Sequence, residues 1–328
     1  MSDAPRVGLS TTMVEPGLTG GRLDGIGVYS NALLRHLPGA GVEVLPFSFA
    51  PPGQAARLTV GRALPLSYPL ATLGDLILPS SVHLNVSRLA PAPLDLFHAT
   101  DYRIMRMDCP VVATLHDALP ICHPEWVRPR LRGLKNWLQA KAARKAQHVI
   151  TGSHYSIREL VECFGVDERR ISVVHHGVGA EWFETPAAAE RSEDLVARLK
   201  AARQNGENVV WLDQLTDHAQ LRHLYAGAGA FIFPSLYQGF GLPVVEAFAS
   251  GVPVATSNAT SLPEVAQGAA LEFDPQSVPE MSAAMTALAR DDALRARCID
   301  AGRRRALELT WDEAARRTAA VYHGVLSQ

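Results

Sequence analysis

The sequence predicts an α/β fold whose sheet is mainly parallel and covered by helices on both faces. Short apolar runs of strand length recur along the chain, and segments of helical period separate most of them. Such interleaving is typical of parallel strands joined by crossover helices. With 328 residues, the chain is also long enough for roughly two domains.

The first half of the chain opens with an apolar run and then a helix that carries Leu33, Leu34 and Leu37 on one face. The expected strands cover residues 7–11, 42–47, 94–99, 111–115, 148–152 and 171–175, and the expected helices cover 26–37 and 155–163. Residues 52–93 have no clean period, so no element is assigned to them.

The second half repeats this style. The expected strands cover residues 209–212, 231–233, 252–256 and 270–273, and the helices cover 220–226, 244–250, 279–289, 293–307 and 312–326. We place the boundary just after Gly177, near residue 178, with an N-terminal domain over 1–178 and a C-terminal domain over 179–311.

The composition excludes several classes of protein. A formal net charge of −2 argues against a dedicated nucleic-acid-binding protein, whose domain is strongly basic. The polar start of the chain and the lack of a run of about 20 apolar residues predict neither a signal peptide nor a membrane-spanning helix.

The cysteines are widely spaced and form no C-x-x-C pattern. We therefore expect reduced thiols in a cytosol, with neither a zinc site nor a disulfide framework. The residues concerned are Cys109, Cys122, Cys163 and Cys298.

The most informative stretch runs from Pro234 to Glu246 and reads PSLYQGFGLPVVE. It lies between the apolar run 230–233 and the helix expected over 244–250. A glycine-rich loop between a strand and a helix presents backbone N–H groups and a positive dipole end to an anion. Glu246 falls in the first turn or two of the helix. The pattern suits a sugar nucleotide, with its diphosphate on the amides and its hydroxyls on the carboxylate.

A second glycine-containing loop, residues 15–28, joins the first expected strand to the first helix. Gly25 and Gly27 would let the backbone approach a diphosphate there. The full dinucleotide pattern G-x-G-x-x-G is absent because residue 30 is Ser, and a plain surface turn explains the same glycines.

His116 follows the strand expected over 111–115. Ligands of open α/β sheets bind beyond the carboxyl ends of strands, where a histidine can hold a substrate hydroxyl or share a proton. A structural histidine that is satisfied by its own loop is the alternative.

A metal site is not expected. His175 and His176 end the strand 171–175, but a site there requires a third ligand, such as His98, His116 or His123, to converge on them. The D-x-D pattern of many metal-bound nucleotide sugars is absent, as are a P-loop and a G-x-S-x-G nucleophile elbow.

A basic run lies between residues 128 and 145 and contains no acidic residue. Leucines and Trp137 share one helical face within it, so the run suits either an anionic membrane surface or a solvated helix that packs on its own domain. Its basic residues are Arg128, Arg130, Arg132, Lys135, Lys141, Arg144 and Lys145.

These motifs together resemble the retaining glycosyltransferases of family 4, the glycosyl transferases group 1, which have the two-domain GT-B fold. Besides 234–246, the matching segments are GIGVY (25–29), TLHD (114–117), HPE (123–125), VITGSHYS (149–156), ISVVHHG (171–177), LRHLY (221–225), SLPE (261–264) and LTW (309–311).

The resemblance implies two Rossmann-like domains, with the acceptor on the N-terminal one and the nucleotide sugar mainly on the C-terminal one, and a last helix (312–328) that crosses back. It implies retention of configuration and no metal or other cofactor beyond a GDP- or UDP-sugar substrate. The implied catalytic positions are His116, Gln238 and Glu246. The implied donor-binding positions are Gly25, Gly27, Gly239, Phe240, Gly241, Leu242 and Glu246.

Two departures from the family pattern are visible. Gln238 replaces the first glutamate of the E-x7-E pair, which keeps hydrogen-bonding capacity but loses a negative charge. A βαβ unit with an Arg-Lys diphosphate clamp is also missing, because residues 187–206 read as one polar stretch whose Arg191, Lys200 and Arg203 lie in another context. The C-terminal domain is therefore expected to be reduced.

Several functions remain open. The first is a cytoplasmic hexosyltransferase that moves a mannose-like sugar onto a glycan or lipid-linked acceptor in polysaccharide biosynthesis, with peripheral contact to the inner face of the membrane through 128–145 as one option. The second is a catalytically impaired relative that binds a glycan, nucleotide or protein. A nucleotide-sugar epimerase is a third, less favoured alternative. Oligomeric state is not indicated.

Overall fold

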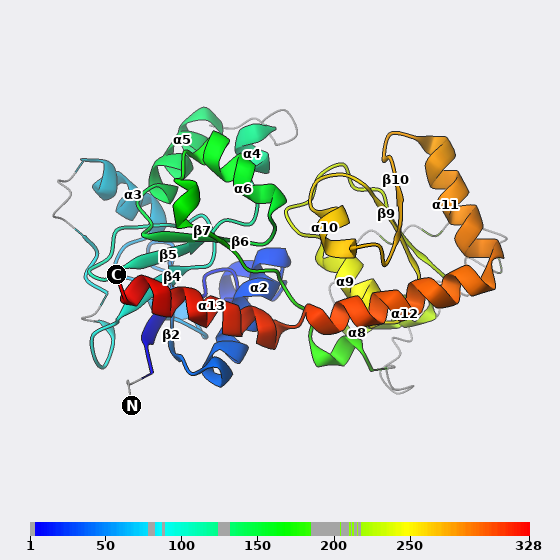
Figure 1. Cartoon of the computed structure of the whole chain (residues 1–328). Coiled ribbons are helices and arrows are strands. Elements are labelled where there is room, and N and C mark those ends of the chain that lie inside the picture. The colour runs from blue at the N-terminus through cyan, green and yellow to red at the C-terminus, as the bar shows by residue number, and fades with distance from the viewer. Residues whose placement is uncertain are drawn as a thin grey trace. The chain divides into compact units, whose positions relative to one another are not determined.

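The computed structural model describes residues 4–77, 83–86, 89–123, 132–184, 204, 210, 212, 215 and 218–328. The chain divides into two compact units. Unit 1 contains Met1–Gly177, Tyr237–Phe240 and Trp311–Gln328, and unit 2 contains Val178–Leu236 and Gly241–Thr310. Figure 1 labels the elements of both units.

Unit 1 is built on a seven-stranded sheet whose paired strands are all parallel, which confirms the predicted fold class. The strands are β1 (Arg6–Ser10), β2 (Glu43–Ser48), β3 (Arg62–Ala63), β4 (Leu96–Ala99), β5 (Val111–Thr114), β6 (His148–Thr151) and β7 (Ile171–Val173). Their order is β3-β2-β1-β4-β5-β6-β7, which reverses direction between β1 and β4. Ligands of doubly wound sheets bind at such a switch point, beyond the carboxyl ends of the strands.

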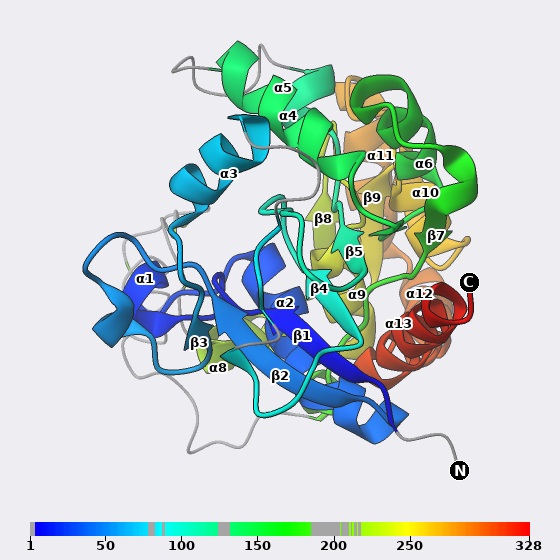
Figure 2. The ribbon, with the colours of Figure 1, turned by 90° about the vertical axis from the view of Figure 1, so that its left-hand side faces the viewer.

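Helices cover both faces of this sheet (Figures 1 and 2). One face carries α3 (Tyr68–Ile77), α4 (Leu119–Cys122), α5 (Arg132–Ala143), α6 (Tyr155–Glu159) and the π-helical turn η5 (Leu160–Phe164). The other face carries α2 (Gly25–His36), the 3-10 turn η1 (Leu37–Ala40) and α13 (Trp311–Leu326). Shorter turns are α1 (Pro16–Thr19), η2 (Ala55–Arg57) and η6 (Glu168–Arg170).

Successive residues of β4 show how the sheet separates two cores. Phe97 packs in an apolar cluster with Ala143 of α5 and Phe164 of η5. The side chain of its neighbour His98 lies on the opposite face, where its Nδ1 is 2.6 Å from the hydroxyl of Tyr322 in α13. Alternate strand residues point to opposite faces, so a strand covered on both sides is apolar or fully hydrogen-bonded throughout.

The hydrogen bonds of His98 continue toward the carboxyl edge of the sheet. Its Nε2 lies 2.8 Å from Oγ1 of Thr114, which is also 2.8 Å from the hydroxyl of Tyr29. All of these side chains are fully buried or nearly so. The network therefore connects the C-terminal helix, the sheet and α2 through satisfied polar groups, as buried polar groups require.

Unit 2 has a smaller parallel sheet of order β10-β9-β8 among the described residues. Its elements are η7 (Ala180–Trp182), α8 (His218–Gly227), β8 (Phe231–Phe233), α9 (Leu242–Ala249), β9 (Val254–Ser257), α10 (Leu262–Ala266), β10 (Leu271–Phe273), α11 (Val278–Arg290) and α12 (Asp292–Glu308). Helices α9 and α12 pack closely, since a Cβ on Gly302 would lie 2.6 Å from Phe248.

Some expected features fall on residues that the structure does not describe. The strand expected over 209–212 includes undescribed positions. Nearly all of the polar stretch 187–206, with Arg191, Lys200 and Arg203, lies outside the described residues. Residues 128–131 of the basic run also lie outside the described part. Within the described part of the run, Trp137 is 52% exposed, and Nζ of Lys141 lies 5.0 Å from its ring.

The prediction of reduced cysteines is wrong for one pair. Cys122, at the end of α4, forms a disulfide with Cys163 in η5, and their Cα atoms are 6.2 Å apart. The partners are 41 residues apart in sequence, so spacing gave no signal. They meet because α4 and η5 pack side by side on the same face of the sheet. Cys109 and Cys298 are free thiols.

Among the described residues, no helix combines the length and the apolar character that crossing a bilayer requires.

Candidate functional site

The carboxyl ends of four neighbouring strands in unit 1 bring polar residues to one edge of the sheet. Thr100 follows β4, His116 lies two residues beyond β5, Ser153 follows β6 and His176 lies beyond β7. This edge of a doubly wound sheet is where ligands bind, so it is the candidate site of unit 1.

His116 has a hydrogen-bond partner for each ring nitrogen. Nε2 lies 2.9 Å from the carbonyl oxygen of Thr100, so this nitrogen carries the proton and donates it. Nδ1 is then an acceptor, 3.3 Å from Nε2 of His176. Burial lowers the pKa of His116, against the opposing effect of the Thr100 carbonyl. The ring is therefore neutral at pH 7, and its longer bond to His176 is the one that a substrate hydroxyl would replace.

His176 is only 4% exposed and lies among aromatic rings. Its ring centroid is 4.7 Å from that of Tyr29, 5.0 Å from that of Phe240 and 6.1 Å from that of Trp311. Burial, with the neighbouring His116, holds its pKa well below the usual value. The Nδ1 atom has no hydrogen-bond partner among the described residues. The sequence singled out His176 only as a metal ligand, whereas it is the partner of His116.

The two glycines at the start of α2 differ in their surroundings. The helix begins at Gly25, and the carboxylate of Asp24 caps it by accepting the N–H of Gly27 at 2.8 Å. A Cβ on Gly25 would meet nothing within 4 Å, whereas one on Gly27 would lie 2.8 Å from the carbonyl oxygen of Met13. Gly27 thus permits a close approach within its own loop, and its N–H is already bonded.

The segment Tyr237–Phe240 of the glycine-rich motif belongs to unit 1. The carbonyl of Gly239 accepts the hydroxyl of Ser153 at 2.7 Å, and the ring of Phe240 packs on His176. A Cβ on Gly239 would lie 2.2 Å from the carbonyl oxygen of His116, so only glycine fits here. The segment that contains Gln238 is therefore packed against the backbone of His116.

The rest of the motif belongs to unit 2 and starts α9. Gly241 precedes the helix with a φ of 106°, a conformation that favours glycine, and Leu242 is the first helical residue. Glu246 lies in the second turn, and its Oε2 is 3.5 Å from the hydroxyl of Tyr225. Burial raises the pKa of Glu246 to about 7, although the Tyr225 bond opposes this.

The predicted site residues thus divide into two groups. Unit 1 holds Gly25, Gly27, His116, Gln238, Gly239 and Phe240, and unit 2 holds Gly241, Leu242 and Glu246. The two members of the E-x7-E pattern, Gln238 and Glu246, belong to different units. Their roles stay predictions.

Sequence reasoning missed Thr100, Tyr237 and Glu159. Tyr237 lies inside the motif that was recognised, and its hydroxyl donates to the carboxylate of Glu159 in α6. Glu159 is buried. Its spacing of three residues from Ser156 is the signal that places these two side chains on one face of α6.

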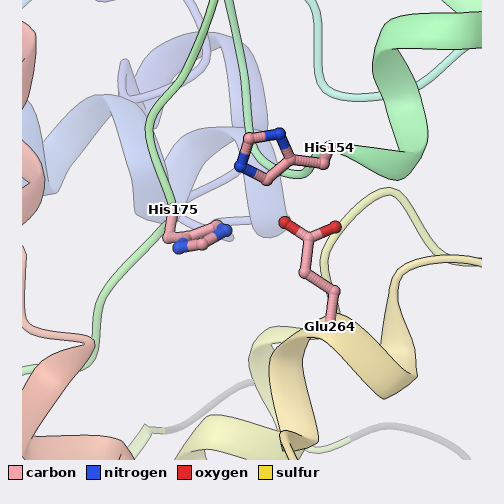
Figure 3. A group of neighbouring side chains, drawn as sticks. All are labelled: His154, His175 and Glu264. Carbon is pink, nitrogen blue, oxygen red and sulfur yellow. The ribbon is translucent and has the colours of Figure 1, made fainter.

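Of the histidines that were considered for a metal site, His116 lies against His176, whereas His98 and His123 have other partners in the described part of unit 1. His98 is bonded to Tyr322 and Thr114, and His123 lies beside the ring of Tyr237. Figure 3 draws His154 and His175, whose ring centroids are 6.2 Å apart, together with Glu264 from α10 of unit 2. Within either unit, the described residues contain no group of three metal-ligating side chains in reach of one ion.

Comparison with protein families identifies the chain. The family model described as "Glycosyltransferase Family 4" matches residues 23–182, and "Glycosyl transferases group 1" matches residues 177–305. The chain belongs to the family 4 glycosyltransferases.

Two relatives of this family 4 glycosyltransferase are mannosyltransferases. The O-antigen chain mannosyltransferase B of Escherichia coli is 42% identical over 102 residues, which cover 31% of this chain and 27% of that protein. The MMP alpha-(1->4)-mannosyltransferase of Mycolicibacterium hassiacum is 28% identical over 69% of this chain and 68% of its own length.

Solved structures share the fold at low sequence identity. A sucrose-phosphate synthase from Thermosynechococcus elongatus matches with a TM-score of 0.68, 15% identity and coverage of 98% of this chain and 99% of that chain. HepE of Anabaena, in complex with UDP, matches with a TM-score of 0.65, 14% identity and coverage of 98% and 100%. The family 4 glycosyltransferase therefore has the GT-B fold that its motifs predict.

Proposed function

We propose that this chain transfers a hexosyl group, mannose or a similar sugar, from a GDP- or UDP-sugar to a hydroxyl of a glycan or lipid-linked acceptor, with retention of configuration and without a metal. The observation that carries the proposal is the placement of Glu246. It lies in the second turn of α9, the helix that follows β8 and the glycine-rich loop, and its carboxyl is largely buried.

The surroundings of Glu246 suit a nucleotide sugar. Gly241 and Leu242 lie at the start of α9, where the helix dipole favours a diphosphate. A carboxylate one turn further along would accept sugar or ribose hydroxyls. Mannosyltransferases among the relatives, and HepE structures in complex with UDP and with UDP-glucose, support the same class of donor.

In the proposed reaction, the protein mainly positions the donor and the acceptor. The bond between the anomeric carbon and the departing diphosphate breaks while the acceptor oxygen bonds to that carbon, and the acceptor proton leaves on the diphosphate. The neutral His116 would hold a hydroxyl near this centre through Nδ1. Gln238, which is uncharged, would hydrogen-bond the transferred sugar. Rate enhancement then comes from alignment and from stabilising the leaving group.

Thermal unfolding with GDP, UDP and their hexose derivatives tests donor binding. We expect at least one of them to raise the Tm of the wild type, and Glu246→Ala to abolish that rise. Glu272→Ala, which removes an exposed carboxylate of β10 in the same unit, should keep it. A Tm that no nucleotide changes would contradict the proposal.

Transfer from a radiolabelled donor to extracted glycan and lipid acceptors tests turnover. Labelled product is expected from the wild type. Nucleotide binding without any transfer or donor hydrolysis would instead support the alternative of a catalytically impaired binding protein. The observation that favours this alternative is Gln238, which stands where the family pattern has a glutamate. Conversion of the donor to an epimer without an acceptor would support the epimerase alternative.

A further inference from the structure

One face of α6 and the loop before it is directed at the segment Tyr237–Phe240. Ser153, Ser156 and Glu159 occur at intervals of three residues, and all three are buried. Ser156 and Glu159 lie on one face of α6, and Ser153 lies in the loop before this helix. Ser153 and Ser156 belong to the conspicuous stretch 149–156, to which the proposed reaction assigns no role.

The serines contact the segment on the C-terminal side of Gln238. Oγ of Ser153 donates to the carbonyl of Gly239 at 2.7 Å, and Oγ of Ser156 lies 3.5 Å from the same oxygen. The two hydroxyls are also 3.0 Å apart, so they orient each other. The carbonyl that follows Gln238 is thereby fixed to unit 1.

Glu159 contacts the segment on the N-terminal side of Gln238. One of its oxygens accepts the hydroxyl of Tyr237, and the other accepts the hydroxyl of Tyr155 at 3.1 Å. The Tyr237 hydroxyl in turn accepts the N–H of Ala118 at 3.2 Å. Burial and the bond to Glu159 raise the pKa of Tyr237 far above the usual value, so the phenol stays a donor throughout the working range of pH.

The anchored segment is also fixed against the strand loop that carries His116. Gly239 lies so close that any side chain there would overlap the carbonyl of His116, and Ala118, which donates to Tyr237, is two residues further on. Tyr237 and Gly239 are thus held on either side of Gln238, against the residues that flank His116.

We propose that Glu159, Tyr237 and Ser153 are positioning residues, which hold Gln238 in place beside His116 for the transferred sugar. The inference rests on the proposed function, because it assigns these residues to the same site. They act through the backbone of Gln238 and not by touching the nucleotide. Removing an anchor should therefore lower kcat while leaving nucleotide affinity, to which Glu246 of unit 2 contributes, unchanged.

The variants Tyr237→Phe and Glu159→Ala test this. Displacement of a reacting group by about 1 Å costs up to about 100-fold in rate, so we expect kcat to fall about 10- to 100-fold in Tyr237→Phe and Glu159→Ala, with nucleotide Kd within about twofold of wild type. Glu159→Gln keeps an acceptor oxygen and should restore part of kcat. Tyr68→Phe removes a hydroxyl that donates to the Tyr102 carbonyl and should leave kcat unchanged.

Hydrogen exchange supplies a readout that does not depend on turnover. Amides in a peptide covering 237–241 should exchange faster in Tyr237→Phe and Glu159→Ala than in wild type, while strand β5 keeps its protection. Wild-type kcat and exchange in both variants would overturn the inference. A wild type that transfers no sugar would overturn the proposed function instead, and the exchange of 237–241 would still decide whether these residues anchor the segment.

Discussion

At the scale of single residues, Glu246 couples the candidate donor site to the stability of unit 2. Burial raises the pKa of its carboxyl to about 7, from 4.5 in an exposed chain. Between these values the folded state holds a proton that the unfolded chain has released. The stability associated with this proton is therefore complete below pH 4.5 and is lost as the pH rises through 7.

Replacing Glu246 with Gln should remove this dependence. We expect the variant to be more stable than wild type at pH 8, by at most ~3 kcal/mol, because a neutral amide avoids burying a charge. The two proteins should converge near pH 4.5. Urea unfolding across this range measures the difference, with Glu272→Gln as the exposed control. Parallel pH profiles for Glu246→Gln and wild type would show that the carboxyl is not desolvated.

Other residue-scale features were only partly visible in the sequence. Glu246 and Gln238 could be located because the motif around them is local. The pairing of His176 with His116 could not, because these residues follow different strands and meet only when β5, β6 and β7 lie side by side. The same holds for Glu159 and Tyr237, which are 78 residues apart.

At the scale of elements, the start of α2 distinguishes a permissive glycine from a required one. Gly25 and Gly27 both lie in the first turn, yet only Gly27 approaches the backbone of the preceding loop. Its contact with the Met13 carbonyl and its bond to Asp24 define how the loop enters the helix.

The same substitution at the two positions should give opposite results. Gly27→Ala places a methyl group 2.8 Å from the Met13 oxygen, and we expect a loss of about 1–3 kcal/mol of stability from overpacking. Gly25→Ala meets open space and should be neutral or stabilising by up to about 1 kcal/mol, since alanine suits a helix better. Urea midpoints of the two variants decide the matter, and equal effects would refute the distinction.

Hydrophobic periodicity predicted the existence and type of most elements but missed their finer geometry. The helix expected over 155–163 is the short α6 followed by the π-helical turn η5, a difference that the period of apolar residues does not resolve. The disulfide between Cys122 and Cys163 depends on the packing of two separate elements, so no local pattern indicates it.

At the scale of the whole molecule, the buried histidines give unit 1 a pH dependence opposite to that of Glu246. Burial lowers the pKa of His116 and His176 and brings that of His98 to about 3. These rings are neutral in the fold, whereas the unfolded chain takes up protons below pH 6.5. Stability is thus complete above pH 6.5 and falls with further acidification.

Calorimetry between pH 7.5 and 5 should show this loss. Each fully buried histidine should lower the free energy of unfolding by about 1.4 kcal/mol per pH unit below 6.5, until its own folded pKa is reached. The stability of unit 1 should therefore fall steeply with acidification. His176→Asn should reduce the slope of stability against pH by the equivalent of about one proton taken up on unfolding. His323→Asn, at an exposed position of α13, should not alter this slope. An unchanged slope in His176→Asn would contradict the neutral state inferred for that ring.

The return of α13 to unit 1 has a consequence for how the protein is made. The bond between His98 and Tyr322 joins residues 224 positions apart, and Asp312 bonds His36 across 276. A ribosome must therefore synthesise all of unit 2, over a period on the order of ten seconds, before the last helix can cover α2. During that interval the nascent unit 1 has an uncovered apolar face, and Nδ1 of His98 lacks its Tyr322 partner. Binding of chaperones to the emerging chain is thus expected to persist until the final residues leave the ribosome.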